Sequence, residues 1–143
     1  MKVLLSILII LPLFISCNQS PNYKSVRDDV VAIHDKVMID YELAYRNKRK
    51  LDTLAKNLDT LKNQHDINIR NKKKEISDLT AQLVHADDLM NDWMHKFDAE
   101  LGNKTNDEAV AYFNAEKLKI QSIDTLYKQV LKRSNEYLSS EEK

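Results

Sequence analysis

Glycine and proline are almost absent from most of this chain. Gly102 is the only glycine, and the two prolines, Pro12 and Pro21, both lie near the N-terminus. The tight turns that connect strands depend on Gly, Pro and Asn-Gly pairs, so the rest of the chain is poorly suited to a sheet. Its 143 residues suit one domain. The sequence therefore predicts an all-α protein with long helices.

Apolar residues recur at three- and four-residue steps in three segments, which is typical of helices that bury one face. The clearest stripe belongs to the second segment and consists of Ile76, Leu79, Leu83, Ala86, Met90, Trp93 and Phe97. We expect helices over about 25–62, 67–101 and 106–138, packed as an elongated antiparallel three-helix bundle within 25–138. One continuous helix through residues 62–66 is the alternative, because no Gly or Pro marks a turn there.

Capping signals mark the turn between the second and third helices and the start of the first helix. Thr105 and Glu108 form a T-x-x-E capping box that opens the third helix, and Gly102 is a stop signal after the second. Ser25 and Asp28 stand in a similar relation at the start of the first helix. Residues 139–143 are expected to fray.

The N-terminus has the character of a signal peptide. A basic Lys2 precedes an apolar run over residues 3–15, which is shorter than the roughly 20 residues that a transmembrane helix needs. The run ends in LFISC at residues 13–17, which resembles the bacterial lipobox, although Phe14 stands where Leu is commoner. The resemblance implies cleavage after residue 16 and lipidation of Cys17, the only cysteine.

The alternative to lipidation is an ordinary secreted protein that keeps an unpaired Cys17. Residues 17–24 form a polar tether with no acidic cluster after the cysteine. In envelope lipoproteins such a cluster can direct export to the cell surface. We therefore expect a lipid-anchored protein of the bacterial envelope, on the periplasmic face of the outer membrane.

A fold-back near residue 64 brings the first and second helices face to face and predicts a layer rich in sulfur and aromatic groups. His34 then lies opposite Met94, and Met38 lies opposite Met90, with Trp93 and Phe113 in the same layer. Imidazole and thioether groups suit Cu(I), and a Met/His pair can bind haem iron. The competing interpretation is core packing, because Met fills irregular gaps beside aromatic rings. We expect no cofactor, with copper or haem at His34, Met38, Met90 and Met94 as the alternative.

A second group of possible metal ligands follows one face of the second helix. His85, Asp88, Asp92 and His95 are spaced by three, four and three residues, which suits a divalent ion. This face lies opposite the apolar stripe. We therefore expect it to be an exposed, solvated surface.

Charge is balanced overall but unevenly distributed. Folding the chain as a bundle gathers many acids near the anchored end, among them Asp28, Asp29, Asp35, Asp92, Asp98, Asp107 and Glu108. It places basic residues farther away, among them Arg46, Lys48, Arg49, Lys50, Arg70, Lys72, Lys73, Lys74, Lys117, Lys119, Lys128, Lys132 and Arg133. The basic part could meet an anionic polymer or an envelope protein, or could simply keep the bundle soluble. Zero net charge gives no case for nucleic acid.

Three stretches together resemble a family of small bacterial lipoproteins whose members often carry the label "viral A-type inclusion protein". They are HDKVM (34–38), LVHADDLMNDWMHKF (83–97) and AEKLKIQSI (115–123). The family has no established activity, so the resemblance implies only a lipid-anchored helical envelope protein. Catalytic motifs such as G-x-S-x-G and H-E-x-x-H are absent. The sequence therefore predicts a non-enzymatic binding or structural module, for which a helical oligomer remains open.

Overall fold

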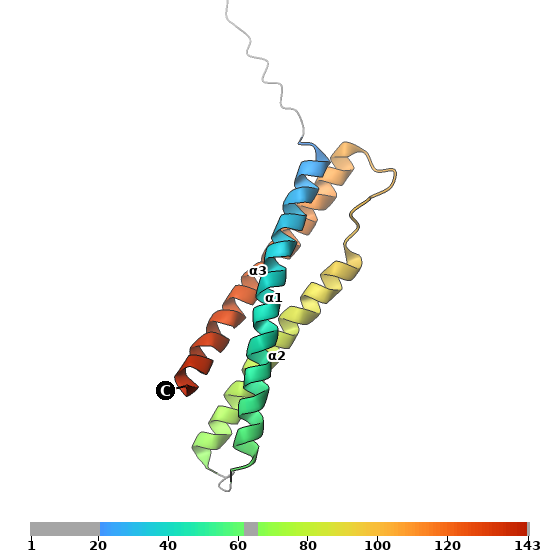
Figure 1. Ribbon diagram of the computed structural model, residues 1–143. Helices are drawn as coiled ribbons and strands as arrows, with labels where there is room; N and C mark the ends of the chain where they lie inside the picture. Colours follow the sequence, from blue (N-terminus) through green and yellow to red (C-terminus); the bar gives the residue numbers. More distant parts are fainter. Residues whose placement is uncertain (1–20, 62–65, 143) are drawn as a thin grey trace, which may run out of the picture.

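Three long helices form the fold: α1 (Tyr23–Asp59), α2 (Ile67–Lys96) and α3 (Asn106–Glu141). They come from a computed structural model that describes residues 21–61 and 66–142. α1 and α3 run parallel, and α2 runs antiparallel to both (Figure 1). The expected all-α three-helix bundle is confirmed, and the described residues contain no strand. The signal peptide at 1–16, Cys17 and most of the tether lie outside the described residues, as does most of the expected turn at 62–66.

The core is one column of apolar side chains that follows the predicted stripes. Val30, Leu51, Leu83, Phe113 and Tyr127 are fully buried within it. Burying an aliphatic or aromatic side chain of this size contributes about 1.5–3 kcal/mol relative to leaving it exposed. This column is what holds the helices together.

The start of α1 differs from the predicted one. The N-cap is Asn22, whose side-chain oxygen accepts a hydrogen bond from the backbone N–H of Lys24 at 3.0 Å. Ser25 lies inside the first turn, and its own N–H donates to the carbonyl of Asn22 at 3.0 Å. The prediction of a Ser25–Asp28 capping box was therefore wrong, because an asparagine three residues earlier already captures a free N–H group.

α2 also ends earlier than predicted, at Lys96 rather than at residue 101. The side chain of Asp98 accepts hydrogen bonds from the backbone N–H groups of Glu100 and Leu101, at 3.0 and 3.2 Å. Such an Asx turn offers the backbone an alternative to the helix. Leu101 and Gly102 then both adopt positive φ, at 48° and 54°. The turn therefore occupies the whole of 97–105 instead of the Gly102–Asn103 pair alone.

α3 begins as predicted and continues further than predicted. Thr105 and Glu108 form the reciprocal capping box, with the N–H of Thr105 donating to Glu108 Oε2 at 2.9 Å. The helix extends to Glu141, three residues beyond the expected end at 138, and the fraying expected for 139–143 stays a prediction. Tyr137 and Leu138 are buried in the core, which explains why the last turns stay helical.

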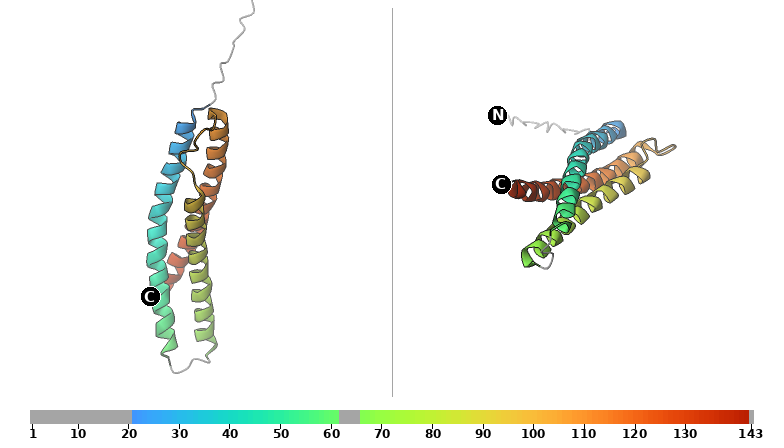
Figure 2. Two further views of the ribbon diagram at one scale, coloured as in Figure 1. Left: turned by 90° about the vertical axis from the view of Figure 1, so that its right-hand side faces the viewer. Right: turned by 60° about the horizontal axis from the view of Figure 1, so that its bottom comes forward.

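The end of α3 stops short of the turn between α1 and α2. Glu142 lies 3.6 Å from Lys50 Nζ, and Glu141 lies 2.7 Å from Lys72 Nζ, so α3 ends level with these two lysines. Beyond them the last turns of α1 and the first turns of α2 have no third helix beside them (Figures 1 and 2). We call residues 46–59 and 66–75 the hairpin end. The opposite end, where residue 21 enters α1, is the N-terminal end.

Candidate functional site

Aromatic rings form a layer at the N-terminal end. Trp93 stacks on Phe97 with ring centroids 4.8 Å apart, and Tyr112 meets Phe113 edge-on at 5.2 Å. The ring of His34 lies against Trp93 at 5.8 Å. Such pairs contribute about 0.5–1.5 kcal/mol each beyond their buried area. α1, α2 and α3 all supply rings, which fixes their relative position at this end.

The four possible copper or haem ligands occupy different environments. Met90 is fully buried in the core, Met38 packs at its edge, and Met94 is 37% exposed. His34 is half-buried, and its Nδ1 lies 3.1 Å from a carboxylate oxygen of Asp35. Met90 and Met38 therefore have the surroundings of packing residues, and the metal role of the set stays a prediction.

Trp93 also makes a buried polar contact that the sequence analysis missed. Its indole N–H donates to Glu116 Oε2 at 2.9 Å, and Lys119 Nζ donates to the other carboxylate oxygen at 2.7 Å. Glu116 is only 5% exposed. Both carboxylate oxygens have partners, so this arrangement joins α2 to α3 rather than offering a free acid. The available signal was a gap in the apolar stripe of α3, where an acid stands one turn after Phe113.

A second, partly buried pair links the same helices. Tyr127 is fully buried, and its hydroxyl donates to Asp87 Oδ1 at 2.7 Å. Burial raises the pKa of Asp87 above its ordinary value, against the opposing effects of the Tyr127 hydrogen bond and of Lys48. Burial, followed by the hydrogen bond to Asp87, also raises the pKa of the Tyr127 hydroxyl. The tyrosine is therefore a neutral donor at physiological pH, which suits a structural role.

The second group of possible metal ligands is exposed, as predicted: His85, Asp88, Asp92 and His95 all lie on the surface of α2. Asp92 pairs with Lys96 at 2.7 Å, and His95 Nδ1 lies 2.7 Å from the carbonyl of Asn91. Within residues 21–61 and 66–142, no three His, Cys, Asp or Glu side chains are grouped as metal ligands would be.

Basic side chains gather at the hairpin end, as the sequence predicted for most of them. They are Arg46, Lys48, Arg49, Lys50, Lys56, Arg70, Lys72, Lys73 and Lys74, against the acids Asp52, Asp59, Asp66 and Glu75. The prediction was wrong for two lysines of α3, which lie near the N-terminal end. Lys117 pairs with Asp29 at 2.7 Å, and Lys119 pairs with Glu116 beside the aromatic layer.

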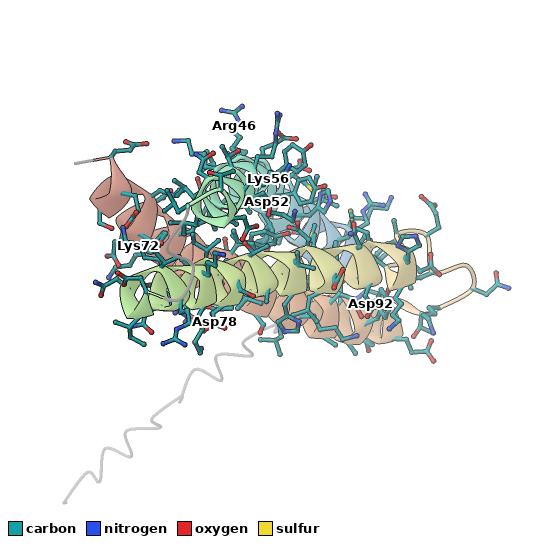
Figure 3. All side chains as sticks on the ribbon, turned by 90° about the horizontal axis from the view of Figure 1, so that it is seen from below. Arg46, Asp52, Lys56, Lys72, Asp78 and Asp92 are labelled. Atoms are coloured by element: carbon teal, nitrogen blue, oxygen red, sulfur yellow. The ribbon has the colours of Figure 1, made fainter. Side chains whose placement is uncertain are left out.

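Most lysines of the hairpin end have a carboxylate partner, but the two arginines of α1 do not. Lys48 pairs with Asp52 at 2.9 Å and Lys73 pairs with Asp59 at 2.7 Å. Arg46 and Arg49 are exposed and form no ion pair within the described part of the chain. Figure 3 shows Arg46 projecting from the side of α1 that faces away from α2. Lys56 and Arg70 are also exposed and form no ion pair within the described residues, so four unpaired cations lie at this end.

Arg46 and Arg49 share a shallow surface hollow with Lys50 and Thr53, with a volume of about 300 Å³. The four positions follow the i, i+3, i+4, i+7 pattern, so they lie on one face of α1. The sequence indicated a basic region but not this hollow. From the sequence alone, the residues of this hollow could not be distinguished from the paired lysines, because the positions of the carboxylates on α2 and α3 were not known.

Comparison with protein families, curated proteins and solved structures finds no match to this chain. Across α1, α2 and α3, no helix is long and apolar enough to cross a membrane. The candidate functions therefore rest on the residues described above.

Proposed function

We propose that this protein is a lipid-anchored envelope lipoprotein and a non-enzymatic helical binding module. Its hairpin end binds an anionic polymer, while lipid on Cys17 holds the other end at the outer membrane, on the periplasmic side. The resemblance to small envelope lipoproteins in residues 34–38, 83–97 and 115–123 supports the same address.

The observation that carries this proposal is the separation of charge along the length of the bundle. The chain enters α1 at Tyr23, beside the acids of the N-terminal end, and reaches the basic hairpin end after a helix of 37 residues. At 1.5 Å per residue this helix is about 55 Å long. A membrane anchor before residue 21 would therefore hold the basic surface several nanometres from the anionic lipid headgroups, where it is free to meet another polyanion.

Acidic side chains near the anchor support the same orientation. Asp28, Asp35, Asp98 and Asp107 are exposed at the N-terminal end. An anionic leaflet repels such carboxylates, whereas it attracts basic segments by about 1 kcal/mol for each Lys or Arg near the surface. The bundle would therefore stand away from the membrane instead of lying on it.

The binding proposal can be tested with a defined polyanion. The full chain, purified in nonionic detergent, should bind long-chain polyphosphate, and the logarithm of the association constant should fall linearly with the logarithm of salt concentration, as for other multi-cation contacts. Replacing Arg46, Arg49, Lys56 and Arg70 with Gln should abolish binding. Lys24→Gln with Lys104→Gln, at the opposite end, should leave it unchanged. Equal losses in the two variants would contradict a localised surface.

The lipid anchor and the membrane localisation have a separate test. In cells, Cys17→Ala should abolish palmitate labelling and globomycin-sensitive processing, and should release the protein from the membrane fraction. Unchanged membrane association of Cys17→Ala would refute the lipid anchor while leaving the polyanion experiment valid.

A further inference from the structure

We propose that Arg46, Arg49 and Lys50 form a discrete binding site for a phosphate group on the outer face of α1. The inference rests on the proposed function, since it names the chemical group of the anionic polymer and the residues that recognise it.

The geometry of one helical face brings the three cations together. Arg46 and Arg49 are one turn apart, Lys50 follows directly, and the three side chains line one surface hollow of about 300 Å³ with Thr53. Thr53 donates its hydroxyl to the carbonyl of Arg49 at 2.9 Å. The threonine is thus engaged with the backbone, which leaves the three charged groups to contact a ligand.

Like charges placed this closely repel each other unless an anion lies between them. Most lysines of the hairpin end have such an anion within the bundle, as Lys48 has Asp52 at 2.9 Å and Lys74 has Asp78 at 2.5 Å. Neither Arg46 nor Arg49 has such a partner, and Lys50 has only Glu142 at 3.6 Å. The site therefore keeps two uncompensated guanidinium groups, which is the state that an external oxyanion would neutralise.

The side-chain chemistry favours phosphate over carboxylate. A guanidinium group is planar and donates paired hydrogen bonds to two oxygens of one anion. A terminal phosphate group carries close to two negative charges at neutral pH and has three free oxygens that can accept from both arginines, whereas a single carboxylate has only two oxygens. Lys50 adds a flexible point charge at the edge of the same hollow.

The test is a titration of the full chain with inorganic pyrophosphate, followed by NMR of ¹⁵N-labelled protein in nonionic detergent. Shifts should concentrate on the Arg46, Arg49 and Lys50 amides and on the guanidinium Nε signals. Arg46→Gln with Arg49→Gln should weaken binding on the order of tenfold or more, as expected for loss of charge-assisted hydrogen bonds. Lys56→Gln with Arg70→Gln removes the same charge from the same end and should change affinity less than about twofold, because neither side chain lines the hollow.

Two further comparisons keep the inference open to refutation. Arg46→Lys with Arg49→Lys keeps the charge and should still weaken pyrophosphate binding, since an ammonium group cannot form the paired contact. Citrate at the same concentration should bind less tightly than pyrophosphate. Equal pyrophosphate affinity in the two Gln variants, or full affinity in the Lys variant, would overturn the discrete site. In that case salt-sensitive polyphosphate binding would still stand as evidence for the proposed function.

Discussion

The indole N–H of Trp93 on α2 donates to the buried carboxylate of Glu116 on α3 at 2.9 Å. Trp93 is the only tryptophan in the chain, and both residues are almost fully buried. Lys119 binds the second carboxylate oxygen, so both oxygens of this buried side chain have a partner. The pair thus ties the two helices together at the edge of the aromatic layer.

Removing Glu116 should destabilise the bundle measurably. Glu116→Ala leaves the indole N–H without an acceptor and should lower the free energy of unfolding by about 1–3 kcal/mol. Glu116→Gln keeps an acceptor of the same shape and should cost less. Urea denaturation followed by the fluorescence of Trp93 measures both. Equal stability of Glu116→Ala and the wild type would show that water replaces the carboxylate at no cost.

The Asp87–Tyr127 pair predicts a specific dependence of stability on pH. Because burial raises the pKa of Asp87 above its ordinary 3.8, the folded state binds this proton more tightly than the unfolded state does. The contribution of Asp87 to stability therefore falls as pH rises through that raised pKa. Asp87→Asn should be more stable than the wild type at pH 7, and the difference should shrink as pH falls toward 3.8.

Urea denaturation at a series of pH values checks this prediction. A companion series in Tyr127→Phe separates the effect of burial from that of the hydrogen bond. If Asp87→Asn is less stable than the wild type at pH 7, the charged hydrogen bond to Tyr127 outweighs the burial of the carboxylate, and the predicted direction is wrong.

Asn47 of α1 makes a buried polar contact with α3. It is 8% exposed, and its Nδ2 donates to Ser134 Oγ at 2.8 Å and to Asn135 Oδ1 at 2.7 Å. Asn47→Ala should lower the free energy of unfolding by about 1–3 kcal/mol. A double-mutant cycle with Ser134→Ala should give a coupling of about 0.5–3 kcal/mol. Strict additivity of the two substitutions would contradict a direct interaction.

Met90 distinguishes the packing and copper hypotheses. If it is a core residue, Met90→Leu conserves volume and should cost less than about 1.5 kcal/mol. The full chain should then form no stoichiometric complex in titrations with Cu(I) or haem. A one-to-one Cu(I) complex that is lost in Met90→Leu with Met94→Leu would establish the alternative. His34→Gln in the same titration would show whether the imidazole takes part.

Periodicity predicted the helices because each stripe had to be buried against the others. The same stripes contained the signals for the buried polar groups, since Glu116 and Ser134 stand where apolar residues are missing from the stripe of α3. What those groups bind could not be read from the sequence, because their partners Trp93 and Asn47 lie on other helices. Side-chain hydrogen bonds to the backbone also determined two helix ends. Asn22 accepts from the N–H of Lys24 at the start of α1, and Asp98 accepts from the N–H of Leu101 just after α2 ends.

For the basic region, too, the sequence predicted the location but not the contacts. Its location follows from folding the chain near residue 64, whereas the distinction between paired Lys48 and unpaired Arg46 depends on side-chain geometry. Exposed ion pairs contribute only about 0–1 kcal/mol each, so folding does not require a particular pairing at these positions.

Because α3 ends early, the two ends of the bundle should differ in how easily they open locally. Past Lys50 and Lys72, two helices shield each other's backbone, and Leu54 and Leu58 are only partly buried. Local opening is least costly where few apolar contacts must separate. Amide hydrogens at 54–59 and 67–71 should therefore exchange with deuterium first, and those around Tyr127 and Leu83 last. The turns that follow the proposed phosphate site, and not the site itself, would then be the part that can rearrange without unfolding the rest.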